Sequence, residues 1–378
     1  MHPTPPGNAL LEAAERWGTP LYVTDLDAAA DHARAWREAL PGALVAYAVK
    51  ANPDPELLRR LAGDGFGFEV VGPVELALAQ RAGAPADRIV VNGVGQTDAD
   101  LADALATGAL VNAESLGALD VLLGAGGGRI GLRVNPALDA RTHPHLATGA
   151  ETAKFGIGLD ELPSALERVR AAGVSVESIG AHIGSDIGEL EPFGRLAELL
   201  ARLARESGAE RVDLGGGYVG DPAAFGAAVR PHIAGLGVTV EPGRSIVADA
   251  GWLVTRVVRV QRGHLVADAG MTELIRPMLY GATHPVTLLA PGAPTPDSAW
   301  TLSGPICEAG DVLAVGVRLG AEAGEGALLA IGQAGAYGSA MASNYNGRLR
   351  PAQVVIEAGE VRLSRRRERL EDLVARDV

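Results

Sequence analysis

Short apolar runs alternate with amphipathic segments between residues 44 and 243. The apolar runs are rich in β-branched residues and predict strands at 44–50, 68–71, 88–92, 110–113, 130–135, 178–185, 211–214 and 238–241. In the segments between them apolar residues recur every three or four positions, as in 190–206, which predicts helices. Eight successive strand–helix units predict an α/β fold, and more specifically a (β/α)8 barrel rather than an open sheet.

The pattern changes after residue 244. Segments such as 251–261, 328–331 and 353–356 are strand-like and are separated by turns rich in glycine and proline. This predicts a C-terminal all-β domain, and the apolar segment 20–23 is expected to add a strand to it. We therefore expect a barrel domain at 26–248 and a β-domain formed by 1–25 and 249–378.

The composition narrows the class of protein. The chain has 378 residues, of which 47% are hydrophobic and 21% charged, as in globular proteins. A net charge of −13 argues against binding to nucleic acid or acidic lipid, and we find neither a bilayer-spanning apolar run nor a signal-peptide pattern. The single cysteine, Cys307, excludes an intrachain disulfide and fits a reducing compartment. We expect a cytoplasmic protein and assign no metal-binding residues.

Lysine is nearly absent from the chain. Of 33 basic residues only Lys50 and Lys154 are lysines. An amine nucleophile must lose its proton, which lysine can do and arginine cannot. Lys50 ends the first predicted strand, where burial disfavours its charged form, whereas Lys154 follows no predicted strand and is expected to anchor a loop. The alternative interpretation of Lys50 is a buried salt bridge.

Polar residues occupy other predicted strand ends, where (β/α)8 barrels build their active sites. Asn92, Glu114 and Arg133 end or follow three of the strands, and His182 and Ser185 end the sixth. A core histidine that only completes a hydrogen-bond network is the alternative interpretation of His182.

Glycines and a carboxylate follow the last two predicted strands. The triplet 215–217 follows the seventh strand, where backbone N–H groups often bind phosphate, whereas the glycine-rich run 124–128 precedes a strand and so lies at the opposite face. Glu241 ends the eighth strand, and an ion pair with Arg244 is its alternative interpretation.

An amine, a phosphate-binding glycine loop and a carboxylate around one barrel mouth match the needs of pyridoxal 5'-phosphate (PLP). The lysine forms a Schiff base with the cofactor, the glycines and Ser185 bind its phosphate, and the carboxylate keeps the pyridine nitrogen protonated.

Several motifs resemble those of the diaminopimelate decarboxylases. They are YAVKAN (47–52), HIGS (182–185), EPGR (241–244), GPICE (304–308), AYGSAM (336–341) and the longer DAGMTELIRPMLY (268–280). This family belongs to the fold-type III PLP enzymes, the fold of alanine racemase and ornithine decarboxylase. The resemblance extends from about residue 20 to 377 and implies decarboxylation of meso-2,6-diaminopimelate to L-lysine and CO2. Alanine racemases place an arginine at the ring nitrogen, so Glu241 favours a decarboxylase.

The resemblance also implies roles for individual residues. Lys50 would carry the cofactor, His182 would stack on its ring and Glu241 would contact its nitrogen. The phosphate and its surroundings would be held by Ser185, Gly216, Gly217, Gly243, Arg244 and Tyr337. The substrate would be bound by Arg244, Arg276, Tyr280, Glu308 and Tyr337, and Cys307 would return a proton to the substrate carbon. The resemblance further implies a homodimer in which Cys307 and Glu308 complete the partner's active site.

The chain departs from the usual family sequence at 69–75, at Asp186 and in a shortened 218–225 segment. These differences keep two further hypotheses open. One is the same chemistry on another carboxylated amino acid, pathway-specific or carrier-bound. The other is a catalytically silent PLP-binding relative.

Overall fold

The computed structural model describes residues 6–138, 149 and 153–378. The chain divides into two compact units. One consists of Ala30–Pro53 and Leu58–Ser245, and the other of Met1–Ala29, Asp54–Leu57 and Ile246–Val378.

The first unit is a closed parallel barrel, as the sequence predicts. Its eight strands in the described part of the chain are β2 (Leu44–Ala48), β3 (Gly67–Val70), β4 (Ile89–Val91), β5 (Leu110–Ala113), β6 (Ile130–Asn135), β8 (Val176–Gly180), β9 (Arg211–Asp213) and β10 (Gly237–Val240). Each strand pairs with the next in this order, and β10 pairs with β2 to close the ring. All eight predicted apolar runs therefore supply a barrel strand.

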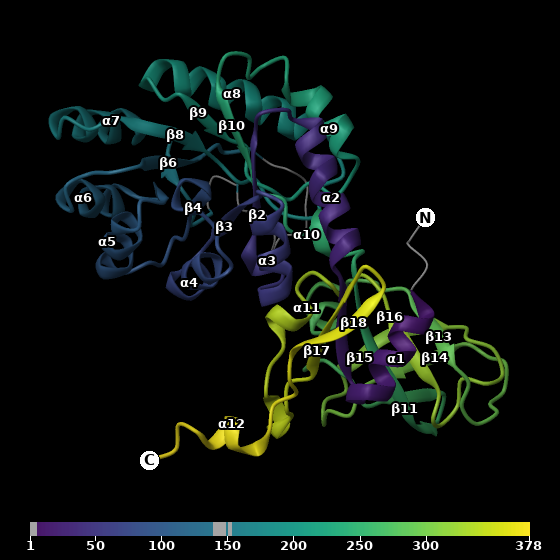
Figure 1. Cartoon of the computed structure of the whole chain (residues 1–378). Helices are drawn as coiled ribbons and strands as arrows, with labels where there is room; N and C mark the ends of the chain where they lie inside the picture. Colours follow the sequence, from purple (N-terminus) through teal and green to yellow (C-terminus); the bar gives the residue numbers. More distant parts are fainter. Residues whose placement is uncertain (1–5, 139–148, 150–152) are drawn as a thin grey trace. The chain divides into compact units, whose positions relative to one another are not determined.

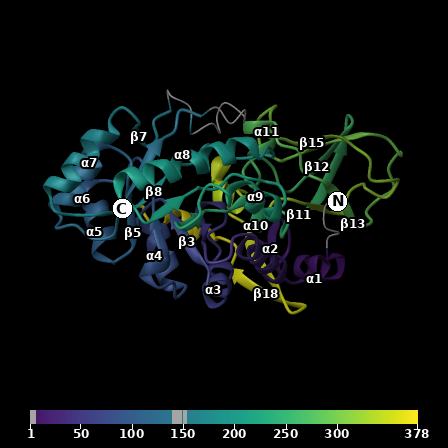
Figure 2. The same ribbon diagram turned by 90° about the horizontal axis from the view of Figure 1, so that it is seen from above.

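A helix follows each barrel strand, and Figures 1 and 2 show these helices outside the strands. They are α3 (Pro55–Gly63), α4 (Pro73–Arg81), α5 (Asp98–Ala106), α6 (Leu116–Gly124), α7 (Leu162–Ala171), α8 (Glu191–Ser207), α9 (Pro222–Val229) and α10 (Arg244–Val247), with α2 (Leu26–Ala39) ahead of β2 and the short strand β7 (Ile157–Gly158) beside β6. Helix α8 buries Phe193, Leu196 and Leu200, spaced three and four residues apart, on the face that meets the barrel.

Two strands end two or more residues before their predicted ends. Strand β2 ends at Ala48, and Lys50 lies in the following 3-10 turn, η1 (Val49–Ala51). Strand β8 ends at Gly180, so His182 and Ser185 lie in the loop that follows it. This loop includes Gly184 at φ +143° and Asp186 at φ +67°, backbone conformations that turn the chain out of the strand direction.

The second unit is built on a mixed sheet. Its strands are β1 (Leu21–Asp25), β11 (Gly251–Gln261), β12 (His264–Ala267), β13 (Val286–Ala290), β14 (Trp300–Ser303), β15 (Val312–Val317), β16 (Leu328–Ile331), β17 (Ala352–Glu357) and β18 (Glu360–Arg365). The predicted extra strand at 20–23 is confirmed as β1, which pairs antiparallel with β11 and parallel with β17. Besides the expected strands, this unit contains α1 (Gly7–Trp17), α11 (Arg276–Tyr280), α12 (Leu370–Val374) and two 3-10 turns, η4 (Ser339–Met341) and η5 (Tyr345–Gly347).

Two apolar cores lie on opposite faces of this sheet. Leu21 and Val23 of β1 contribute to the core that also contains Leu10 of α1, whereas Tyr22, between them, contributes to the other core with Leu253. Alternation along a strand places neighbouring side chains on opposite faces. Strand β1 is therefore buried on both sides, although it comes from the N-terminal end of the chain.

Two absences hold for residues 6–138, 149 and 153–378. None of the helices there combines the length and hydrophobicity needed to cross a bilayer. Nor do three or more His, Cys, Asp or Glu side chains gather there in a way that would hold a metal ion.

Candidate active site

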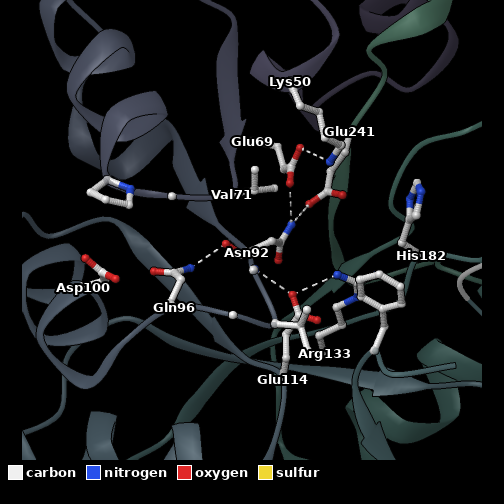
Figure 3. Close-up of a pocket in the computed structure, with 16 residues that line it drawn as sticks. Lys50, Glu69, Val71, Asn92, Gln96, Asp100, Glu114, Arg133, His182 and Glu241 are labelled. Atoms are coloured by element: carbon white, nitrogen blue, oxygen red, sulfur yellow. Dashed lines mark hydrogen bonds and ion pairs between the residues drawn. The ribbon is translucent and has the colours of Figure 1, made fainter. Parts of the chain in front are cut away.

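A cavity of about 450 Å3 opens at the carboxyl ends of the barrel strands. Its walls include Lys50, Glu69, Asn92, His182 and Glu241, which come from five different strands or the loops after them (Figure 3). The volume lies within the range of about 300–1,000 Å3 found for sites that bind cofactors and other small molecules. Three of the residues predicted from the sequence, Lys50, His182 and Glu241, therefore share one cavity.

A hydrogen-bonded chain connects Lys50 to Glu241. The Lys50 Nζ donates to Glu69 Oε2 at 2.6 Å, and Asn92 Nδ2 donates both to Glu69 Oε1 at 3.2 Å and to Glu241 Oε1 at 2.7 Å. Figure 3 shows the Asn92 amide between the two carboxylates. The Lys50 side chain is 35% exposed whereas that of Glu69 is 1% exposed, so the amine faces the cavity from a buried anchor.

A second ion pair lies at the neighbouring strand ends. Arg133 Nη1 donates to Glu114 Oε1 at 2.9 Å, and the backbone N–H of Gly93 donates to the same oxygen at 2.7 Å. The Arg133 guanidinium also lies over the Phe155 ring, with Cζ 5.0 Å from its centroid. Both cations of the cavity are therefore paired with carboxylates.

The environment changes the protonation of Glu241 and His182. Burial, followed by the charges of Asp213 and Glu69, raises the pKa of Glu241 well above its ordinary value. Burial, followed by the charges of Lys50 and Arg133, lowers the pKa of His182 well below its ordinary value. The Nδ1 atom of His182 accepts a hydrogen bond from the Gly216 N–H at 3.1 Å. His182 is thus a neutral ring whose orientation is set by the glycine loop.

The glycine triplet is packed too closely for any other residue. A Cβ on Gly216 would overlap the carbonyl oxygen of Glu241, and one on Gly217 would overlap that of Gly184. Gly217 also has φ +100°, a conformation that favours glycine. Nearby, Arg244 Nη2 donates to Ser185 Oγ at 3.1 Å. Glu241 itself accepts a hydrogen bond from Asn92 at 2.7 Å.

These residues fit PLP. The amine of Lys50 is presented to a cavity of suitable size, a buried carboxyl group lies at the same cavity, and the close-packed loop after β9 is of the kind that presents backbone N–H groups to phosphate. The structure thus supplies the amine, the carboxyl and the glycine loop from one barrel.

The other predicted residues lie in the second unit and form two groups. Arg276, in α11, is buried, and its Cζ lies 5.6 Å from the ring centroids of both Tyr280 and Tyr337. The Arg276 guanidinium is thus close to two tyrosine rings, a contact that a cation favours. The predicted substrate-binding residues Arg276, Tyr280 and Tyr337 are therefore neighbours.

Cys307 and Glu308 lie on an exposed loop between β14 and β15. Glu308 Oε1 accepts a hydrogen bond from the Tyr345 hydroxyl at 2.6 Å, and Cys307 is a free thiol. The base of the loop is held by Asp311, whose carboxylate accepts the N–H groups of Met271 and Ile306, both at 2.6 Å. The hydrogen bonds of Asp311 hold the base of the loop, and Cys307 and Glu308 at its tip are exposed to solvent.

Sequence reasoning assigned no role to five residues of the barrel site: Glu69, Asn92, Glu114, Arg133 and Asp213. All five lie in the carboxyl-terminal half of a strand or just after it, and three of them are among the polar strand ends noted above. The feature of the sequence that could have identified these five residues is a polar side chain in, or directly after, an otherwise apolar strand. Lys154 does not line the cavity, and its Nζ lies 5.4 Å from the Phe155 ring centroid.

The chain is similar to known proteins along nearly its whole length. Residues 26–248 match the family described as pyridoxal-dependent decarboxylase, pyridoxal binding domain. A diaminopimelate decarboxylase from Deinococcus radiodurans is 43% identical over 98% of this chain and 99% of its own length. Another, from Aquifex aeolicus, is 37% identical over 97% of this chain and 94% of its own length.

Solved structures agree with the sequence comparisons. The crystal structure of diaminopimelate decarboxylase from Helicobacter pylori, complexed with L-lysine, superimposes with a TM-score of 0.92 at 31% identity, covering 97% of this chain and 98% of that one. The chain therefore belongs to the diaminopimelate decarboxylase family of PLP-dependent decarboxylases.

Proposed function

We propose that this protein decarboxylates meso-2,6-diaminopimelate to L-lysine and CO2 with PLP as cofactor. The observation that carries the proposal is the Lys50 amine on the cavity, connected through Glu69 and Asn92 to the buried carboxyl of Glu241. The substrate is supported by the full-length similarity to diaminopimelate decarboxylases and by the relative whose complex contains L-lysine.

Bound PLP supplies an electron sink that stabilises the carbanion left by the loss of CO2. Lys50 would hold the cofactor through its amine, and the Glu69 carboxylate, 2.6 Å from that amine, orients it at the cavity. Glu241 would face the nitrogen of the cofactor ring. Ser185, Gly216, Gly217, Gly243, Arg244 and Tyr337 would hold the phosphate and its surroundings, and His182 would pack on the ring.

Residues of the second unit, together with Arg244 of the barrel unit, recognise the substrate. Arg276, with Tyr280, Tyr337 and Arg244, binds a substrate carboxylate, and Glu308 binds the amine at the far end. Cys307 delivers the proton that replaces CO2. Diaminopimelate carries an amine and a carboxylate at both ends, which such a set recognises together.

We further propose a cytoplasmic homodimer in which Cys307 and Glu308 of each chain complete the site of the other. The dimer is supported by the exposure of both residues on their loop. The cytoplasmic location is supported by the free thiol of Cys307, which a reducing compartment preserves.

The test is turnover by the PLP-loaded protein with four substrates: meso-diaminopimelate, L-lysine, L-ornithine and L-arginine. We expect CO2 and L-lysine from meso-diaminopimelate and at least about 100-fold lower kcat/KM for the other three, which lack the second carboxylate. Release of CO2 from another acid but not from diaminopimelate would reassign the substrate. No release from any acid would favour a silent PLP-binding protein.

A further inference from the structure

A small polar chamber lies inside the barrel next to the active-site cavity. Its lining includes Asn112, Arg133, His182, Asp213 and Glu241, and its volume is about 10 Å3, room for at most about one water molecule. Asp213, at the end of β9, is 2% exposed, and Glu241 is 6% exposed. Two carboxyl groups are therefore enclosed in the same small space.

Two oxygen atoms at this chamber accept no hydrogen bond from the described residues. Asp213 Oδ1 accepts the N–H of Gly215 at 2.9 Å, but Asp213 Oδ2 is buried with no partner among the described residues, and so is Asn112 Oδ1. The Glu241 carboxyl lies within hydrogen-bonding reach of Asp213. Two ionised carboxylates offer only acceptors, so a hydrogen bond between them requires one proton.

The charges around Asp213 and Glu241 also indicate that the pair carries one proton. The charged or titratable groups around the pair are Lys50 in η1, Glu69 in β3, Glu114 after β5, Arg133 in β6 and His182 after β8. Lys50 is paired with Glu69, and Arg133 with Glu114, while His182 is neutral. If both Asp213 and Glu241 were ionised, two buried negative charges would remain without a cation of their own, which is strongly unfavourable.

We propose that Asp213 and Glu241 share a single proton at neutral pH, held on Glu241 in the free protein and passed to Asp213 when the cofactor binds. The transfer moves one proton between two carboxyl oxygens and leaves the net charge of the pair at minus one. Glu241 is then the anion that faces the ring N–H, and Asp213 is a positioning residue that holds the proton. The transfer of the proton to Asp213 on cofactor binding rests on the proposed function. The sharing of one proton in the free protein does not.

The electrostatics of the two groups agree with this order. Burial raises the pKa of Asp213 to about 6, and it raises that of Glu241 well above its ordinary value. Glu241 is therefore the stronger base in the free protein. A ring N–H directed at Glu241 would favour its ionised form and so drive the proton to Asp213.

Infrared spectroscopy of isotope-labelled protein tests the proposal without measuring turnover. In the apoprotein at neutral pH, Glu241→Gln should remove one protonated-carboxyl band that shifts on 13C-labelling of glutamate. In the holoenzyme, Asp213→Asn should remove one such band that shifts on 13C-labelling of aspartate. Absence of the first band would overturn the proton-sharing pair, and absence of the second would overturn the transfer.

Two controls separate the possible failures. Asp221→Asn, at the exposed N-cap of α9, should leave the protonated-carboxyl region unchanged. If either buried variant fails to fold, labelled wild-type protein still tests the transfer. In the apoprotein the protonated-carboxyl band should shift on 13C-labelling of glutamate, and after PLP is loaded it should shift on 13C-labelling of aspartate instead. A band that stays on glutamate would contradict the transfer, and the absorbance of bound PLP shows independently whether the cofactor is present.

Discussion

Single side chains decide the chemistry of this site because each is held by a partner from a different strand. Lys50 is oriented by Glu69, and Glu69 and Glu241 share the Asn92 amide. The cost of leaving Glu69, Asn92 or Glu241, which are buried, without a partner is about 1–3 kcal/mol, more for a charge. A change at one position is therefore expected to disturb its neighbours as well.

Cys307→Ala should lower kcat by about 100-fold or more while the absorbance of bound PLP persists. The expected role of this thiol is proton transfer to the substrate carbon, a step that contributes about 10²- to 10⁴-fold. The measurement is steady-state turnover of meso-diaminopimelate alongside the PLP content of the same sample. Loss of PLP in parallel with activity would instead place Cys307 in cofactor binding.

The pH dependence of stability should change in Asp213→Asn. Folding raises the pKa of Asp213 from 3.8 to about 6, so the native state binds this proton more tightly than the unfolded chain. Its stabilising contribution is full below pH 3.8 and is lost as the pH rises through about 6. Urea unfolding of the apoprotein should therefore show a free energy that falls more steeply over this range in the wild type than in the variant. Equal slopes would contradict the raised pKa.

The sequence predicted site residues where a polar or charged side chain occurs in an otherwise apolar strand. Lys50, His182 and Glu241 stand out from apolar surroundings and were predicted as site residues. The roles of Glu69 and Asn92 depend on partners 19 to 149 residues away, and the chain alone does not reveal such pairings. Asp213 was missed because its importance arises only from its enclosure beside Glu241.

At the scale of elements, the loop after β9 has no room for larger residues at Gly216 and Gly217. It approaches the backbones of Gly184 and Glu241 so closely that a methyl group has no space. The Gly216 N–H also fixes the His182 ring. The loop therefore links the expected phosphate site to the residue expected to pack on the cofactor ring.

Gly216→Ala should weaken PLP binding by about tenfold or more, because the added methyl group displaces a loop whose backbone position matters. The matched control is Gly124→Ala at the end of α6, where a Cβ meets no atom within 4 Å. PLP affinity is measured by fluorescence titration of the apoproteins, after thermal melts confirm that both variants fold. Equal affinity in the two variants would show that the loop does not hold the phosphate.

The apolar pattern predicted these elements well where they are periodic and buried. All eight barrel strands and β1 lie where the sequence places them. Helix α11 was not predicted, because it has five residues, fewer than two turns, and includes Pro277. Strand ends at Lys50 and His182 were placed too late, since apolar residues continue into the turns that follow.

At the scale of the whole molecule, the predicted site residues fall into two units of one chain. Lys50, His182 and Glu241 belong to the barrel unit, and Arg276, Cys307 and Glu308 belong to the unit with the mixed sheet. If the active site is shared between subunits, two inactive variants should complement each other.

Mixing the Lys50→Ala and Cys307→Ala proteins under conditions that exchange subunits should restore about a quarter of wild-type activity. Random pairing gives one half mixed dimers, and each mixed dimer has one intact site. Analytical ultracentrifugation before and after mixing confirms the dimer. Activity no greater than that of the separate variants, with exchange verified, would place both residues in the same chain's site.

Lys50 is the residue that we propose binds the cofactor covalently. The most direct test is borohydride reduction of the PLP-loaded protein followed by peptide mass analysis, because the chain offers only Lys50 and Lys154 as lysine targets. We predict a pyridoxyl group on Lys50 and an unmodified Lys154. A fully loaded protein in which the Lys50 peptide is unmodified would contradict the account.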